Sequence, residues 1–225
     1  TNIVSVVGSR NASQEGLNKA YHLAVLLGKR GVTVASGLAR GIDTYALKGS
    51  VENRYNCIAV IGTPINRYYP PENKDLQDYI SENGLLISQF PPSASIQRWN
   101  FPLRNSVMSG ISLATAIVEA SETSGALKQA DYALKQNRIV FIPTSAVENE
   151  NISWPKKYLK RKGANQFTRI DELLMMLENH EVIKEVKKKD PIFNDQQIDI
   201  FSINNKEEES LHKNREITKH VFKYE

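Results

Sequence analysis

Short, continuous apolar runs that alternate with helical patterns are the feature of this sequence that most limits its fold. The runs lack a polar residue at every second position, which is typical of strands that are covered on both faces. We predict strands at Ile3–Val7, Val32–Ala35, Cys57–Ile61, Leu85–Ser88, Ala116–Glu119 and Ile139–Ile142. We predict helices at Gln14–Arg30, Ile42–Glu52, Lys74–Glu82, Asn105–Leu113, Gly125–Gln136 and Asp171–Asn179.

This alternation of strands and helices predicts an α/β fold with a doubly wound, mostly parallel sheet and helices on both faces. Ligands of such sheets bind at the carboxyl ends of the strands. The predicted domain covers residues 1–180. Residues 181–225 are more basic and polar, and we expect a C-terminal extension that is docked on the domain or partly disordered.

Composition excludes several classes of protein. The single cysteine, Cys57, excludes an internal disulfide framework and a cysteine-based zinc site, and its apolar run predicts burial. The four histidines lack metal-ligand spacing, so we expect neither a metal nor another cofactor. No apolar stretch is long enough to cross a bilayer and no signal peptide is recognisable, so we expect a cytoplasmic protein that does not associate with membranes.

Three strings that combine small residues or aromatics with arginine fall beside the predicted strands and helices. Small residues let a ligand approach the backbone, and arginine offers a planar set of donors that matches phosphate. With a further helix start, the strings supply the candidate phosphate-binding residues Gly8, Ser9, Arg10, Ser36, Gly37, Leu38, Arg40, Gly41, Phe101, Arg104, Asn105, Ser124 and Gly125. Because nothing among them resembles a catalytic group, we expect a binding protein and no enzyme.

Each string also has a plainer interpretation. The N–H groups of the helix that Ser13 is expected to cap could hold a phosphate together with Arg10, or the loop could be a tight turn with a solvated arginine. Asp43 is expected to cap the helix that follows it, with orientation of Arg40 as the alternative. We expect Glu119, at the end of a strand, to hold a neighbouring arginine.

The third string places arginines beside aromatic residues. Trp99 and Phe101 suit stacking on exposed bases, while anchoring of an irregular loop in the core is the alternative, at least equally strong for Trp99. Arg104 stands near a predicted helix start, where a cation is unfavourable, and a bound anion would compensate it.

Taken in order, these strings resemble the DNA-processing protein A (DprA, also called Smf) family. The resemblance covers about residues 3 to 165 and is carried by Gly8–Arg10, Ser36–Asp43, Tyr69–Asn73, Phe101–Asn105 and Ser124–Gly125. It implies an extended Rossmann-like domain. It also implies a homodimeric protein that binds and protects single-stranded DNA and helps to load a RecA-type recombinase during DNA uptake or repair. In that family the arginine-bearing loops line a pocket for the DNA backbone.

The sequence departs from the family pattern at several positions. Ser106 stands where the family has a second arginine, Leu47 replaces a usual histidine, and Asn66 replaces a usual acid. The loss of one arginine removes a possible phosphate contact. We therefore expect a divergent member with the core domain alone.

Two other functions remain open on the same residues. The fold also suits a sensor that binds a small nucleotide-derived ligand, which would saturate with a mononucleotide. A scaffold with a vestigial pocket would bind neither strand nor nucleotide. Binding to single-stranded DNA should instead depend on strand length and weaken steeply with salt.

Overall fold

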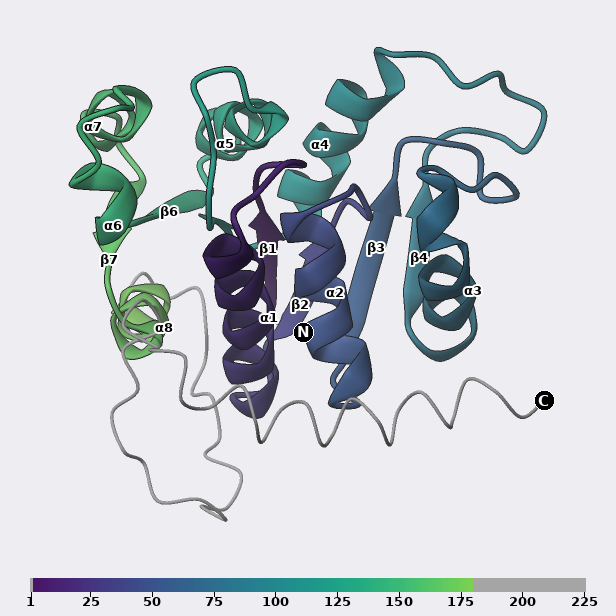
Figure 1. The fold of residues 1–225 in the computed structure, drawn as a ribbon, viewed down its shortest axis with the longest axis horizontal. Helices are drawn as coiled ribbons and strands as arrows, with labels where there is room; N and C mark the ends of the chain where they lie inside the picture. Colours follow the sequence, from purple (N-terminus) through teal and green to yellow (C-terminus); the bar gives the residue numbers. More distant parts are fainter. Residues whose placement is uncertain (1, 180–225) are drawn as a thin grey trace.

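The computed structural model describes residues 2–179 (Figure 1), so the predicted extension over 181–225 lies outside the described residues. The strands are β1 Ile3–Val7, β2 Thr33–Ser36, β3 Cys57–Ile61, β4 Leu85–Ser88, β5 Ala114–Ile117, β6 Ile139–Pro143 and β7 Ala164–Phe167. The helices are α1 Gln14–Lys29, α2 Ile42–Glu52, α3 Lys74–Asn83, α4 Asn100–Ile111, α5 Gly125–Lys135, α6 Thr144–Val147, α7 Trp154–Leu159 and α8 Ile170–Asn179, with a 3-10 turn, η1, at Pro71–Asn73.

The strands form one sheet in the order β4-β3-β2-β1-β5-β6-β7, and every pairing is parallel. The chain winds outward from β1 to β4, returns through α4, and places β5 on the other side of β1. The direction of winding therefore reverses between β1 and β5. In open α/β sheets the ligand crevice lies at such a reversal, outside the carboxyl ends of the strands.

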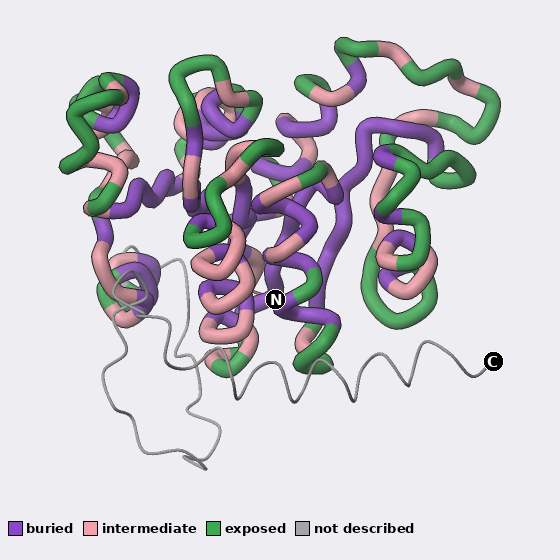
Figure 2. Tube along the Cα trace, in the orientation of Figure 1, coloured by how far each residue is buried: buried purple, intermediate pink, exposed green. Residues whose placement is uncertain are grey.

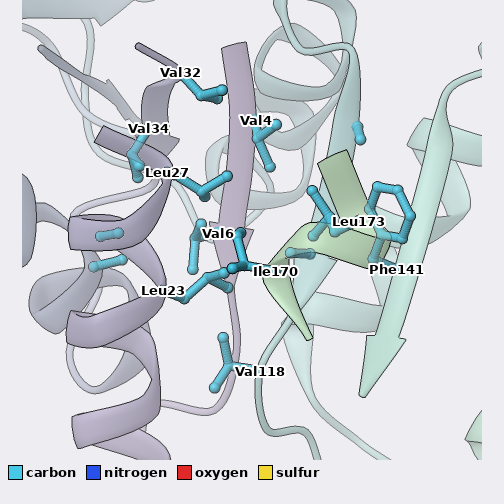
Figure 3. Packing of buried hydrophobic residues seen from close by; sticks show 14 of the residues in the cluster. Val4, Val6, Leu23, Leu27, Val32, Val34, Val118, Phe141, Ile170 and Leu173 are labelled. Carbon is cyan, nitrogen blue, oxygen red and sulfur yellow. The ribbon is translucent and has the colours of Figure 1, made fainter. Parts of the chain in front are cut away.

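Helices cover both faces of the sheet. Successive residues of a strand pack into different hydrophobic clusters, one on each face. Val4 and Val6 of β1 pack with α1 and α8 (Figure 3), whereas Val7 packs on the opposite side with α4, α5 and α7. A third cluster joins α2 and α3 over β3. Figure 2 shows that the inner strands are buried, whereas the edge strands β4 and β7 are partly exposed. The predicted fold class is confirmed.

Local signals explain why these segments become helices. In α1 the Ser13 hydroxyl accepts a hydrogen bond from Gly16 N at 3.0 Å, which confirms the predicted cap. Leu23 and Leu27 then fall on one buried face, as their spacing predicts. The helix stops before Gly31, whose φ of 72° suits glycine. Among the described residues no helix has the length and apolar character that a membrane crossing needs.

Among the predicted elements, β5 and α4 differ most from their predicted bounds. The strand predicted at Ala116–Glu119 lies two residues earlier, at Ala114–Ile117, because Glu119 belongs to the loop beyond it. Helix α4 begins at Asn100 and not at Asn105. Pro102 lies in its first turn, where the missing N–H would have no partner within the helix, so a proline is tolerated there.

Candidate functional site

The loops after β1 and β2 meet at the carboxyl edge of the sheet, beside the reversal between β1 and β5. Ile42 N donates to Ser9 O at 3.2 Å, and Ser9 N donates to Glu119 O at 2.7 Å. The Gly8–Arg10 loop is thus held between the Ser36–Gly41 loop and the segment after β5. The structure brings the first two predicted strings together.

Glycine is required in these loops because the loops touch each other. A Cβ at Gly41 would overlap the carbonyl oxygens of Ser9 and Arg10, and the φ of Gly41 is 74°. A Cβ at Gly8 would overlap the carbonyl oxygen of Glu119. From the sequence we interpreted these small residues as making room for a ligand. The structure instead explains Gly8 and Gly41 by contacts within the protein.

Arg104 lies beneath the Ser36–Gly41 loop, and its predicted position at a helix start was wrong. It is the fifth residue of α4 and is only 5% exposed. Its Nη1 donates to the carbonyl oxygen of Val60 at the end of β3. A Cβ at Gly37 would overlap its guanidinium group, so glycine at 37 makes room for Arg104. Within the described residues, Arg104 Nε has no hydrogen-bond partner.

Asp43 provides the negative charge that faces Arg104. Its carboxylate accepts a hydrogen bond from Gly37 N at 3.1 Å and is 5% exposed. Burial raises the pKa of Asp43, although the charge of Arg104 favours the ionised form. Burial likewise lowers the pKa of Arg104, and the charge of Arg10 acts in the same direction. The expectation that Asp43 caps α2 was wrong. The N-cap residue is Gly41, and no side chain makes a capping hydrogen bond there. The Asp43 carboxylate instead holds the Ser36–Gly41 loop through Gly37 N.

The exposed part of the site combines a cation with aromatic rings. The guanidinium carbon of Arg10 lies 5.9 Å from the ring centre of Phe101. The Phe101 ring in turn lies 5.0 Å from the ring of Tyr69, which is 44% exposed. Trp99 is 62% exposed, so the alternative that it anchors the loop in the core was wrong.

Arg40 projects from the same loop and forms an ion pair with Glu72 of η1. Asp43 does not orient it, which was the alternative that the sequence offered. The backbone beneath Arg40 is fixed, because Asn73 Nδ2 donates to Leu38 O at 2.9 Å and Thr44 Oγ1 donates to Ala39 O at 2.6 Å. Leu38 is fully buried with a φ of 55°.

The start of α1 is already occupied by a carboxylate. Glu119 accepts hydrogen bonds from Ser13 N at 2.9 Å and from Ser13 Oγ at 2.5 Å. The expectation that Glu119 holds an arginine was therefore wrong. A phosphate at this helix end would face the Glu119 charge, which counts against the predicted use of these N–H groups.

The remaining predicted residues lie around this centre. Ser36 is buried, and its hydroxyl donates to Val6 O at 2.6 Å, which joins the ends of β2 and β1. Asn105 is 8% exposed and lies within α4. Ser124 caps α5 by accepting a bond from Ala126 N at 3.2 Å, while Gly125 is exposed. The start of α5 is at the same edge of the sheet, after β5.

Sequence reasoning missed Tyr69, Glu72 and Asn73 as parts of the site. The sequence analysis named them only as part of the family motif Tyr69–Asn73. They follow a buried strand, however, and ligands of such sheets bind at the carboxyl ends of the strands. Their contacts with Phe101, Arg40 and the loop after β2 depend on the path of residues 62–73, which the sequence pattern does not encode. Among the described residues, no group of three or more His, Cys, Asp or Glu side chains could hold a metal ion.

The matching family model and the curated relatives indicate one family. The family model for DNA recombination-mediator protein A matches residues 1–178. Protein Smf of Synechocystis is 39% identical over 143 residues, which are 63% of this chain and 36% of that protein. DNA processing protein DprA of Streptococcus pneumoniae is 35% identical over 176 residues, 78% of this chain and 61% of that protein. The chain therefore spans about half the length of the curated relatives it matches.

Solved structures show the same fold. The X-ray structure of DprA from Streptococcus pneumoniae superposes with a TM-score of 0.67 at 32% identity, covering 77% of this chain and 61% of that one. DprA from Helicobacter pylori superposes with a TM-score of 0.69 at 24% identity, covering 80% and 81%. The latter structure describes a single-stranded DNA binding mode of the Helicobacter protein.

Proposed function

This chain belongs to the DNA recombination-mediator protein A family, and from that premise we propose that it binds single-stranded DNA at the carboxyl edge of its sheet. The Helicobacter pylori relative, which shares the fold, is described as binding single-stranded DNA. Two relatives that match 70% and 78% of this chain are named DNA processing protein DprA.

The observation that carries the proposal is the arrangement of the exposed side chains of Arg10 and Tyr69 around the half-buried ring of Phe101. Arg10 is exposed at the edge where ligands of such sheets bind. Within residues 2–179 no carboxylate forms an ion pair with it. Aromatic rings lie beside it, and an aromatic ring can stack on any of the bases. The guanidinium group of Arg10 can pair with a phosphate of the same strand. A single strand offers both groups, whereas a duplex hides its bases.

Other residues are assigned supporting roles. Arg40 lies on the same edge as a second phosphate contact, and Trp99 supplies a further exposed ring. Arg104 acts from beneath the loop, through its positive charge and its support of Gly37. The exposed start of α5 at Ser124–Gly125 offers N–H donors farther along the edge.

The proposal extends to the role of the protein in the cell. It acts in the cytoplasm as a homodimer that protects single strands and aids loading of a RecA-type recombinase, and it performs no catalysis of its own. The family description, a DNA recombination-mediator protein, supports the part of this proposal that concerns recombination. A recombinase ATPase assay on strands coated with a single-strand binding protein tests this role, because a mediator shortens the lag before hydrolysis.

Binding is tested by fluorescence anisotropy with labelled oligo-dT of two lengths at two salt concentrations. We expect the longer strand to bind more tightly, an excess of a mononucleotide to compete poorly, and Trp99→Ala to weaken binding. Stacking on one base contributes about 1–3 kcal/mol, so this variant should lose between about fivefold and about 150-fold in affinity.

The other outcomes are equally clear. Full competition by a mononucleotide, with no dependence on length, would replace this proposal with the small-ligand sensor. Indifference to both strand and nucleotide would leave a scaffold. A duplex of the same length serves as the control, and we expect it to bind more weakly at each salt concentration.

A further inference from the structure

Arg40 and Glu72 form an ion pair at the edge of the sheet where the proposed DNA site lies. Arg40 Nε donates to Glu72 Oε1, and the two side chains are 62% and 49% exposed. They come from different segments, the loop after β2 and the 3-10 turn η1. The pair therefore joins two parts of the edge on which a strand would lie.

The carboxylate is held in place from below. Asn73, the neighbour of Glu72, is buried and donates to Leu38 O at 2.9 Å and to Thr44 Oγ1 at 2.8 Å. These bonds fix η1 against the loop that carries Arg40. Arginine and glutamate are both ionised at neutral pH. The hydrogen bond between the two side chains also raises the pKa of Arg40 and lowers that of Glu72.

A phosphate that reaches Arg40 meets this carboxylate. Glu72 occupies one donor of the guanidinium fork, and its charge repels a second anion at the same place. Because both side chains are largely exposed, water and salt screen the pair, so a phosphate can displace the carboxylate.

We propose that Glu72 competes with the DNA backbone for Arg40 and so limits the affinity of the site for single strands. This inference rests on the proposed function. A strand that brings several phosphates overcomes the competition, whereas a lone phosphate gains little from Arg40. Glu72 thereby favours long strands over mononucleotides.

The test is oligo-dT binding by Glu72→Gln, measured by anisotropy across a salt series. We expect affinity at low salt to rise about two- to fivefold, since exposed ion pairs are worth little. The dependence of log K on log salt should steepen by up to about 0.7, the value for one more neutralised phosphate on a single strand. Glu82→Gln is the matched control, because Glu82 is exposed near the end of α3, at the opposite edge of the sheet.

Arg40→Ala separates release of the arginine from a general change in charge. In that background Glu72→Gln should give no more gain than Glu82→Gln. An equal gain with and without Arg40, or no gain beyond the control, would overturn the inference while leaving DNA binding intact. If the wild-type protein and Glu82→Gln both fail to bind any strand, the proposed function itself is wrong.

Discussion

At the scale of single residues, three arginines near one edge have three different environments. Arg104 is buried and faces Asp43, Arg40 is exposed and paired with Glu72, and Arg10 is exposed over the ring of Phe101. Only Arg10 combines exposure with freedom from a carboxylate within the described residues. It is therefore the arginine whose removal should affect binding with little effect on folding.

We predict that Arg10→Ala weakens binding of oligo-dT about tenfold, as expected for one charged hydrogen-bonding contact. Its thermal midpoint should stay within about a degree of the wild type, because substitutions of exposed side chains change stability little. Arg54→Ala is the control, since Arg54 is an exposed arginine after α2, at the opposite edge of the sheet. Equal affinity for the wild type and both variants would remove Arg10 from the site.

Arg104→Ala should instead destabilise the fold by about 3–5 kcal/mol, because it removes the buried positive charge that favours the ionised form of the buried Asp43. Burial already raises the pKa of Asp43 in the folded state, so the folded protein binds a proton more readily than the unfolded chain. Stability from such a group is present at low pH and is lost as the pH rises through the folded-state pKa. Without Arg104 that pKa rises further, and the deficit should shrink as the pH falls from 7 toward the ordinary aspartate value of 3.8.

Urea unfolding at a series of pH values measures this effect. Arg104→Ala combined with Asp43→Asn removes the unpaired charge and should lose most of the pH dependence. A deficit that is constant with pH would show that packing, and not the charge of Asp43, sets the cost.

The candidate site was predictable to the extent that residue types reveal it. Small residues and arginine after β1 and β2 indicated the correct edge, because parallel strands end together. The depth of each side chain was not predictable. Arg104 and Arg10 occur in similar motifs, yet Arg104 packs under Gly37 whereas Arg10 is exposed. The reason is that α4 starts earlier than predicted, so that Arg104 is an inner residue of the helix and not its first.

At the scale of elements, the loops after β1 and β2 act as one unit. Gly41 is the contact between them, and its φ of 74° adds a second constraint. Gly31 provides a natural comparison. It has a φ of 72°, yet no heavy atom lies within 4 Å of a Cβ built on it.

We predict that Gly31→Ala costs about 1 kcal/mol, the price of the left-handed backbone alone. Gly41→Ala should cost at least about 2 kcal/mol more. The new methyl group meets the carbonyl oxygens of Ser9 and Arg10, and the ψ of −128° at Gly41 lies outside the left-handed region that alanine can enter. Chemical denaturation of the two variants gives the difference directly. Only Gly41→Ala should also weaken DNA binding, since it alone displaces Arg10. Equal costs in stability would mean that the loops separate without strain.

The helices and strands differ in how closely their observed bounds match those predicted from the sequence. Strands β1 and β3 matched their predicted bounds because both are buried apolar runs with valine or isoleucine at most positions. Strand β7, with the sequence Ala-Asn-Gln-Phe, was missed because it is a polar strand at the edge of the sheet. Strand β7 forms because it pairs with β6 through backbone hydrogen bonds. The local sequence of β7 does not predict that pairing.

At the scale of the whole molecule, the order of strands determines where a ligand can bind. The reversal between β1 and β5 brings Glu119 beside Ser9, although they are far apart in the sequence. The net charge of +4 over 225 residues is modest. Binding of a polyanion should therefore depend on a few placed arginines and not on a general positive field.

We predict that log K for oligo-dT falls with log salt with a slope between about −1.4 and −2, as two or three phosphates on a single strand would give. Arg10→Ala should reduce the magnitude by about 0.7, whereas Arg54→Ala should leave it unchanged. A salt titration by anisotropy measures both. A slope near zero would indicate that stacking alone holds the strand, and a slope beyond about −4 would require a far larger basic surface.

The overlap between a side chain at position 37 and the Arg104 guanidinium also constrains how chains of this kind can diverge. Any side chain at 37 is excluded while arginine stands at 104, and loss of that arginine would leave both a hollow and an unbalanced Asp43. Positions 37, 43 and 104 must therefore change together or stay as they are. A change in the ligand of this edge is therefore easier through substitution of the exposed Arg10 and Arg40 than through these three positions.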